Sequence, residues 1–474
     1  MTDSEGEGRA SHEDDGMRTE AGMTASVRDI SENQTRYILD NLRDAAVYPP
    51  RADNDPDAAP VEFIYRRRHL LTRDQDLRSV LNILNPSRAT VARRTTELPE
   101  AGEVTHPIPG LALVELTGGP ADALGEAQVL FGALQVIEQE LGPGKATPDH
   151  AVHITVTPPP ATNCPATEPD WVPADAPPLP GISRSRCDGR GTLVAVVDTG
   201  LVKETAAWYP WLHGVAGDPD LLVHEGTSIE RYGGHGTFIA SIIRAMAPRA
   251  DVQVVRIFEQ AGAIYETDIV KALLEVLDRA PDVISLSAGT HTWLDGGLLS
   301  FQVFVEGPLR EREGTVLVAA AGNDGADWKF SPADMDQVIG VGALGVPGDA
   351  RAWFSDYGDW VKVYAPGQDL VHAFARGLYQ YQEVRAGQEA WFAGMARWSG
   401  TSFSTPVVSG LIAARMSGTG ENSHEASQSL LRLARAQALP GVGPVLRPGQ
   451  ACLCLCACEQ PCRDRRPGHC GCRS

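Results

Sequence analysis

The second half of the chain contains short, almost entirely apolar runs separated by polar stretches. Six of these runs predict strands: "TLVAVVD", "VQVVRIF", "VISLS", "TVLVAAAGN", "VIGVGAL" and "VKVYAPG". They are continuous rather than alternating, which is typical of parallel strands buried on both faces. Helical periodicity over Thr237–Met246 and Thr267–Arg279 separates several of them. This order predicts an α/β fold with an open parallel sheet, in which sites form beyond the carboxyl ends of the strands.

Residues 59–158, in the first half, have a different order of predicted strands and helices. The predicted order is a strand at "VEFIYRRRHLL", a helix at "DQDLRSVLNIL", a strand near Ala89–Arg93, a strand at "LALVELTG", a helix at "ADALGEAQVLFGALQVIEQELG" and a strand at "HAVHITVTP". The succession β-α-β-β-α-β predicts a small α+β domain of the split-βαβ type.

Composition sets the remaining boundaries of the 474-residue chain. Residues 1–58 are acidic and rich in Gly, Ser and Ala, which predicts a mostly disordered segment. Residues 159–186 are rich in proline, which favours an extended linker over a helix or a central strand. The α/β unit then occupies residues 187–440, and residues 441–474 form a cysteine-rich tail.

Charge and hydropathy exclude some classes of partner. The net charge of -20 argues against nucleic acid, and the short basic run Arg66–Arg68 is more typical of a solvated strand face. The sequence contains no apolar run of about 18 residues, so we expect no membrane partner. The acidic start "MTDSEGEGRASHEDDG" has neither the basic nor the apolar region of a secretory signal, which predicts a cytoplasmic protein.

The nine cysteines are unevenly distributed, and seven of them follow residue 450. The body holds only Cys164 and Cys187, so we do not expect a disulfide scaffold. In a reducing compartment, dense thiols favour metal binding or redox chemistry over disulfides. The spacing fits no standard zinc finger, which leaves two alternatives: a metal on the tail, or a disordered reactive tail.

Two polar residues follow the first strand and open the first helix of the α/β unit. Asp198 lies in "VVDTG" at the end of the first strand, and His235 lies in "GGHGTF" at the start of an apolar helix. Alone, Asp198 is typical of a turn and His235 of a structural histidine. Their positions also suit catalysis, because small neighbours let other groups approach the imidazole closely.

Two further residues have the same double interpretation. Asn323 follows a strand in "AAAGNDG", where an amide can donate to a developing oxyanion or simply form a turn. Ser402 lies in "SGTSFSTPVVSG" at the start of a predicted helix, with Pro406 expected in its first turn. Serine is a favoured N-cap, but a helix start also provides N–H groups that can stabilise an oxyanion.

The order Asp198, His235, Asn323, Ser402 is far more specific than any one of these residues. The region from Gly191 to Arg415 closely resembles the subtilisin-like serine peptidases (subtilases, peptidase family S8). The resemblance is carried by "VAVVDTG", "GGHGTFIASI", "VISLSAG", "VLVAAAGNDG", "FSDYGDWVKVYAPG" and "GTSFSTPVVSG". It implies a three-layer parallel sheet flanked by helices.

The resemblance also implies roles for single residues in peptide-bond hydrolysis through an acyl-enzyme. Ser402 would be the nucleophile, His235 the general base and acid, and Asp198 the residue that orients the imidazole. The Asn323 side chain and the Ser402 N–H would form the oxyanion hole. This chemistry needs no cofactor and no metal, and we see no clear calcium loop.

Substrate-binding residues follow from the same resemblance. The family pairs the substrate backbone with the segment matching "SLSAG", and one wall of the primary specificity pocket precedes Asn323. The residues so indicated are Ser285, Leu286, Ser287, Ala288, Gly289, Ala321 and Gly322. Two departures stand out: Trp328 and Phe330, which can narrow the pocket or pack elsewhere, and the long segment Ala373–Arg397, which can be a hairpin near the site or a surface insertion.

The flanking domain and the substrate leave alternatives open. The split-βαβ domain resembles the family's inhibitory propeptide by position and element order, and a permanent accessory domain fits equally well. The propeptide interpretation predicts self-cleavage between about residues 157 and 190, a stretch that contains the whole proline-rich linker. The leading function is a serine endopeptidase acting on polypeptides. The rivals are a dedicated processing peptidase or transpeptidase, and a catalytically silent peptide-binding scaffold.

Overall fold

The computed structural model of the chain describes residues 35–51, 59–85, 99–154, 168–260, 262–382 and 385–453. The strand expected near Ala89–Arg93, part of the proline-rich linker and most of the cysteine-rich tail lie outside the described residues. Among the described helices, none is long and apolar enough to cross a membrane.

The N-terminal domain has the order β-α-β-β-α-β, with a second strand at Glu100–Ile108 that was not predicted from the sequence. Its members are β2 (Phe63–Arg73), α2 (Asp74–Leu84), β3 (Glu100–Ile108), β4 (Leu111–Thr117), α4 (Ala123–Leu141) and β5 (Ala146–His153). The four strands lie in the order β5-β2-β4-β3, all neighbours antiparallel, which confirms the split-βαβ topology. Apolar residues of α2 and α4 pack on one face of this sheet and form the core of the domain.

Order begins earlier than the composition predicts. A helical segment at residues 35–41 leads into β1 (Ala45–Tyr48), which pairs with β2 in antiparallel register from Ala45↔Arg66 to Tyr48↔Phe63. The expectation of a mostly disordered segment up to residue 58 is therefore wrong for this stretch. Ile38 and Ala45 are buried, so a few apolar positions suffice to attach an otherwise polar segment to the domain.

The peptidase-like domain is built on a seven-stranded sheet in the order β16-β15-β14-β13-β7-β11-β8. Every neighbouring pair is parallel. The strands are β7 (Leu193–Asp198), β8 (Ala216–Gly217), β11 (Asp251–Arg256), β13 (Val283–Leu286), β14 (Val316–Ala320), β15 (Ile339–Leu344) and β16 (Val363–Pro366). All six strands expected from continuous apolar runs are present. Their residues are apolar on both sides because the sheet is covered on both faces.

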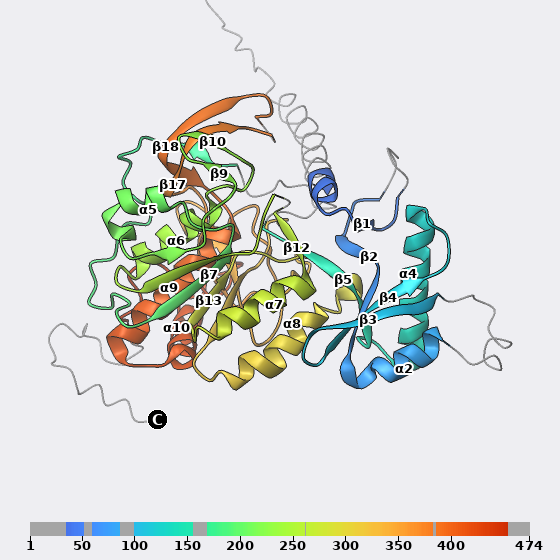
Figure 1. The fold of residues 1–474 in the computed structure, drawn as a ribbon. Helices are drawn as coiled ribbons and strands as arrows, with labels where there is room; N and C mark the ends of the chain where they lie inside the picture. Colours follow the sequence, from blue (N-terminus) through green and yellow to red (C-terminus); the bar gives the residue numbers. More distant parts are fainter. Residues whose placement is uncertain are drawn as a thin grey trace, which may run out of the picture.

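Helices cover the two faces and complete three layers. On one face lie α6 (His235–Met246) and α9 (Thr401–Thr419), with α10 (Ser423–Ala436) packed on α9. On the other face lie α7 (Glu266–Leu277) and α8 (Leu299–Phe304). A short α5 (Lys203–Trp208) contacts β17, and its Ala206 belongs to the same core cluster as α6 and α9. The three-layer α/β architecture is therefore confirmed (Figure 1).

The long segment before Ser402 forms a hairpin. Its strands, β17 (Leu370–Gln380) and β18 (Glu389–Trp398), pair in antiparallel register from Leu370↔Trp398 to Gln380↔Glu389. Short strands extend this hairpin into a sheet in the order β6-β18-β17-β10-β9, with β6 (Asp170–Trp171), β9 (Val223–His224) and β10 (Thr227–Ile229). Of the two alternatives for this segment, the hairpin near the site is the one observed.

The two domains share a continuous sheet. Strand β12 (Ala263–Tyr265) belongs to the second domain by sequence, yet it pairs with β5 of the first domain through Ala263↔His153, Ile264↔Val152 and Tyr265↔Ala151. The N-terminal sheet also packs against α7 and α8, which lie between the two domains in Figure 1. The N-terminal domain is therefore docked on the second domain.

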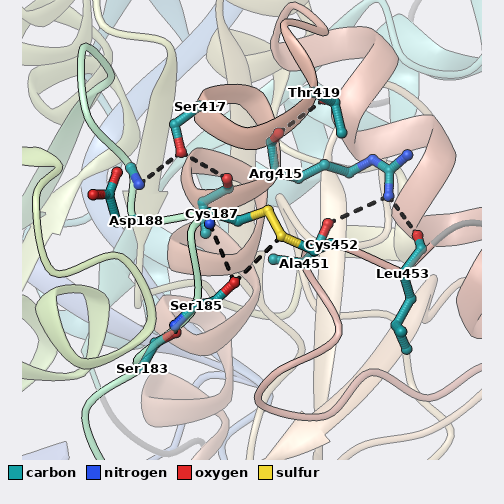
Figure 2. Close-up of a disulfide and its surroundings, with 12 residues drawn as sticks. Ser183, Ser185, Cys187, Asp188, Arg415, Ser417, Thr419, Ala451, Cys452 and Leu453 are labelled. Atoms are coloured by element: carbon teal, nitrogen blue, oxygen red, sulfur yellow. Dashed lines mark hydrogen bonds between the residues drawn. A yellow bond between two sulfur atoms is a disulfide. The ribbon is translucent and has the colours of Figure 1, made fainter. Parts of the chain in front are cut away.

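A disulfide ties the C-terminal segment to the beginning of the second domain. Cys187 is bonded to Cys452, and the Cys187 side chain is buried (Figure 2). Arg415 donates hydrogen bonds to the Leu453 and Ala451 carbonyls at 2.9 and 3.4 Å, beside the bridge. The expectation that the cysteines would serve metal or redox chemistry rather than disulfides is wrong for this pair, because the fold brings residues 265 positions apart into contact.

Candidate active site

The four polar residues singled out from the sequence come together at the carboxyl edge of the seven-stranded sheet. Asp198 is the last residue of β7, His235 is the first residue of α6, and Asn323 follows β14. Ser402 is the second residue of α9. All four are buried.

Asp198 and His235 form a direct pair. His235 Nδ1 lies 2.9 and 3.0 Å from the two carboxylate oxygens of Asp198. A carboxylate only accepts, so this contact favours the tautomer with the proton on Nδ1 and leaves Nε2 as the basic nitrogen. Asp198 Oδ1 also accepts the Thr199 N–H at 2.8 Å, which fixes the orientation of the carboxylate.

The start of the helix that carries His235 requires glycine at the positions directly before and after His235. Gly234 has a φ of +83° at the N-cap, a conformation that side chains other than glycine rarely adopt. A Cβ at Gly236 would lie 2.5 Å from the Gly200 carbonyl oxygen and 3.2 Å from Asp198 Oδ1. These glycines therefore let α6 start against the loop that follows β7.

Asp220 connects the same two loops, and sequence reasoning missed it. Its carboxylate accepts hydrogen bonds from Thr199 Oγ1 at 3.0 Å, from the Gly234 N–H at 2.8 Å and from the Leu222 N–H at 3.0 Å. Burial raises the pKa of Asp220 to about 6. An aspartate within a loop, outside any recognisable motif, gave no signal in the sequence.

Ser402 does not cap its helix as expected. The N-cap of α9 is Gly400, and Pro406 falls in the second turn rather than the first. Proline has no N–H, so the Ser402 carbonyl loses its helical partner at position 406. Ser287 Oγ donates to this carbonyl at 2.8 Å instead, so the segment after β13 replaces the missing helical bond.

His235 lies in an aromatic cluster that includes the residue directly after Ser402. The His235 ring is 5.2 Å from the ring of Phe403, the residue after Ser402, and 5.4 Å from Trp398 at the end of the hairpin. Within the described part of the chain, His235 Nε2 and Ser402 Oγ are both buried without a hydrogen-bond partner. Such orphaned atoms cost free energy and call for an explanation, and catalytic hydrogen bonds often tighten only when substrate binds.

Asn323 is fixed through its carbonyl oxygen. Oδ1 accepts the Thr401 N–H at 2.8 Å and the Thr401 hydroxyl at 3.0 Å. The carboxamide therefore leaves its NH₂ group as the donor for another ligand. The Ser402 N–H is one of the groups at a helix start that have no acceptor within the helix, so it is a second available donor.

The residues expected to bind substrate divide into two groups. Ser285 and Leu286 belong to β13, where Ser285 Oγ accepts from Ser409 and Leu286 packs in the core, so their side chains are committed to the interior. Ser287 and Ala288 follow the strand, and Gly289 forms a two-way backbone pair with His153. Backbone pairing with substrate beyond Leu286 stays a prediction.

The remaining two expected residues lie before Asn323. Ala321 is fully buried in an apolar cluster, with its N–H bonded to the Val341 carbonyl at 3.0 Å. Gly322 has a φ of +105°, and its N–H donates to Thr401 Oγ1 at 3.3 Å. Gly322 is thus the residue whose backbone conformation sets the turn into Asn323.

No cation site accompanies this arrangement in the ranges that the structure describes. Among those residues, no group of three or more His, Cys, Asp or Glu side chains is placed to hold a metal ion. The chemistry available is that of a hydroxyl beside an imidazole–carboxylate pair, with amide donors nearby.

Comparison with known proteins identifies the family. The model of the Subtilase family (Peptidase_S8) matches residues 189–442, more than half of the 474-residue chain. The chain belongs to the Subtilase family. The resemblance expected from the motifs is therefore confirmed, and the matched range contains all four residues of the candidate site.

Individual relatives agree with this assignment. The chain of this subtilase is 32% identical over 272 residues to the thermophilic serine proteinase of Bacillus sp. (strain AK1), covering 55% of this chain and 60% of that one. It is 30% identical to thermitase of Thermoactinomyces vulgaris, covering 47% and 74%. The crystal structure of fervidolysin from Fervidobacterium pennivorans shares the fold with a TM-score of 0.50 at 18% identity, over 82% of this chain and 61% of that one.

Proposed function

We propose that this subtilase is a serine endopeptidase that hydrolyses polypeptides through Ser402, His235 and Asp198. Ser402 Oγ attacks the scissile carbonyl while His235 Nε2 takes its proton, forming a tetrahedral intermediate. His235 then delivers the proton to the leaving amine, and water releases the acyl group by the same route. Asp198 holds the imidazole and stabilises its cation.

One observation carries this proposal: the Nδ1 contacts of 2.9 and 3.0 Å between His235 and Asp198, together with a buried His235 Nε2 and a buried Ser402 hydroxyl that have no partner among the described residues. The Asn323 NH₂ group and the Ser402 N–H supply the oxyanion donors. Preorganised donors of this kind stabilise charge that develops in the transition state. No step requires a cofactor.

The N-terminal domain acts in this proposal as an intramolecular inhibitor. The end of β5 lies between β12 and Gly289: the His153 N–H and carbonyl both bond to Gly289 at 3.1 Å, and the Ile154 N–H donates to the Gly262 carbonyl at 3.0 Å. This is the backbone pairing by which an extended substrate would bind a sheet edge. The domain thus occupies the strand position of a substrate.

A hydrolysis assay tests the proposed function. Purified wild-type protein is expected to cut an unstructured polypeptide, and Ser402→Ala is expected to show no activity above background. Wild-type chain should also be clipped soon after Ile154, while Ser402→Ala stays intact. Equal hydrolysis by the two proteins would contradict the role of Ser402, whereas intact but fully active wild type would contradict inhibition by the N-terminal domain.

A dedicated processing peptidase or transpeptidase is the second candidate. The observation that favours restricted action is the hairpin β17–β18, which puts Trp398 against the catalytic His235 and so adds structure beside the cleft. Cleavage of a random peptide library separates the candidates. Broad cleavage supports a general endopeptidase, and cleavage or ligation of one sequence supports a dedicated enzyme.

A further inference from the structure

We infer that Phe330 fills the primary specificity pocket, so that this enzyme cleaves after small residues such as Gly, Ala, Ser or Thr. The inference rests on the proposed function of Ser402 and names the substrate class of that site. It resolves the two interpretations of Phe330 that the sequence left open.

Strand β5 of the N-terminal domain marks the path that a substrate would take. The strand β5 runs alongside β12 and reaches Gly289, where His153 forms both backbone bonds at 3.1 Å. A substrate on this path presents its scissile carbonyl to Asn323 and Ser402. The side chain of the residue that bears this carbonyl, the P1 residue, must then leave the backbone between Gly289 on one side and Gly322, next to Asn323, on the other.

The ring of Phe330 lies in that space. A Cβ added to Gly289 would collide with Phe330 Cε1 and Cδ1. A Cβ added to Gly322 would collide with the buried Asp356 Oδ2 and would lie 3.0 Å from Phe330 Cγ. One aromatic side chain therefore spans the distance from one backbone wall to the other. Phe330 is 4% exposed, so little room remains beside it.

The ring is held rigidly. Residue 331 pairs with Thr290 through two backbone bonds of 2.9 Å, which run alongside the Gly289 wall. His291 directly follows Thr290. Its Nδ1 lies 2.9 Å from the Lys329 carbonyl oxygen and its Nε2 lies 3.1 Å from Asp324 Oδ2. The His291 ring centre is 5.4 Å from that of Phe330. These contacts fix the backbone on both sides of Phe330, so its ring cannot swing away to admit a large side chain at low cost.

Trp328 differs from Phe330 although both are bulky departures in the same loop. It is 39% exposed and contacts the ring of His291 with centroids 5.7 Å apart. It meets neither Gly289 nor Gly322 in the way Phe330 does. Trp328 is therefore the matched control for Phe330.

The test uses full-length protein and two peptidyl phosphonate probes that differ only in carrying Ala or Phe at P1, beside a plain fluorophosphonate. Wild type is expected to react with the Ala probe roughly 100-fold faster, within the range by which pocket size discriminates apolar groups. Phe330→Ala should reduce this preference at least tenfold, and Phe330→Leu should reduce it less. Trp328→Ala should keep the wild-type ratio.

The outcomes are separable. A wild type that reacts with the plain fluorophosphonate but accepts Phe at P1 as well as Ala overturns the pocket assignment and leaves the proposed function standing. An unchanged ratio in Phe330→Ala does the same. If Phe330→Ala fails to fold, Phe330→Leu and the wild-type ratio still decide. Failure of the plain probe on wild type that has been clipped after Ile154 removes the proposed function and this inference together.

Discussion

At the scale of single residues, the site depends on partners that lie far apart in the sequence. Asp198 orients His235 through two contacts, and Asp220 joins the loops that carry them through Thr199 and Gly234. Asn323 is oriented by Thr401, the residue directly before Ser402. His235 and Asn323 are thus each oriented by a neighbour from a different strand or helix, which is how functional side chains can be held in one arrangement.

Asp198→Asn tests the orientation of the imidazole. An amide can donate to Nδ1 and so favours the tautomer with the proton on Nε2, which cannot accept the serine proton. We expect kcat to fall by about 10⁴-fold with little change in the fold, as judged by circular dichroism. A loss of less than tenfold in the hydrolysis assay would contradict the role of Asp198.

At the scale of elements, the sequence predicted most of the fold. Continuous apolar runs mark parallel strands, and each of the four candidate site residues lies near the end of such a run or at a helix start. The sequence did not predict that Gly400 caps α9 or that Pro406 falls in its second turn, because both depend on where the helix starts. It also could not predict that Trp398 reaches His235, since a hairpin returns it there.

The replacement of a helical bond by Ser287 leads to a prediction for α9. Ser287→Ala leaves the Ser402 carbonyl without a donor and should destabilise the fold by about 1–3 kcal/mol. Pro406→Ala restores an N–H at the position that faces this carbonyl, so the same Ser287→Ala change should then cost less. A double-mutant cycle measured by urea unfolding should give a coupling of at least about 0.5 kcal/mol. Strictly additive effects would contradict the proposed exchange of donors.

At the scale of the whole molecule, the N-terminal domain and the subtilase domain meet through a buried polar network. Asp149 of β5 accepts hydrogen bonds from the Thr267 N–H and Oγ1 at the start of α7 and pairs with Arg66 at 3.0 Å. The neighbouring His150 contacts Glu266, and both are fully buried. Element order in the sequence predicted the domain, but the contacts of Asp149 and His150 with α7 link residues more than 100 positions apart and left no local pattern.

Docking of the two domains should depend on pH through Asp149. Burial, above all other causes, raises the pKa of Asp149 to about 7, with Arg66 opposing and Glu266 and Asp268 assisting the shift. The docked state therefore binds a proton more tightly than the undocked state. The stabilisation that this proton gives to the docked state is complete below the ordinary aspartate pKa of about 4. It is lost as the pH rises through about 7.

Hydrogen exchange measures this effect in the intact chain. In Ser402→Ala, which should stay unclipped, the amides of β5 and β12 should lose protection between pH 5 and pH 8 after correction for intrinsic rates. Adding Asp149→Asn should remove most of that dependence, while the amides of β14, in the middle of the central sheet, serve as an internal control. Protection of β5 that increases with pH would contradict the predicted direction of this dependence.

The nucleophile is the centre of this account, and the most direct measurement is the site of a covalent adduct. Wild-type protein treated with a fluorophosphonate and digested should show one modified peptide, with the added mass on Ser402. Asp198→Asn should react far more slowly at the same position, and Ser402→Ala should carry no adduct. An adduct on another residue, or equal labelling of wild type and Ser402→Ala, would contradict the assignment of Ser402 as the catalytic serine.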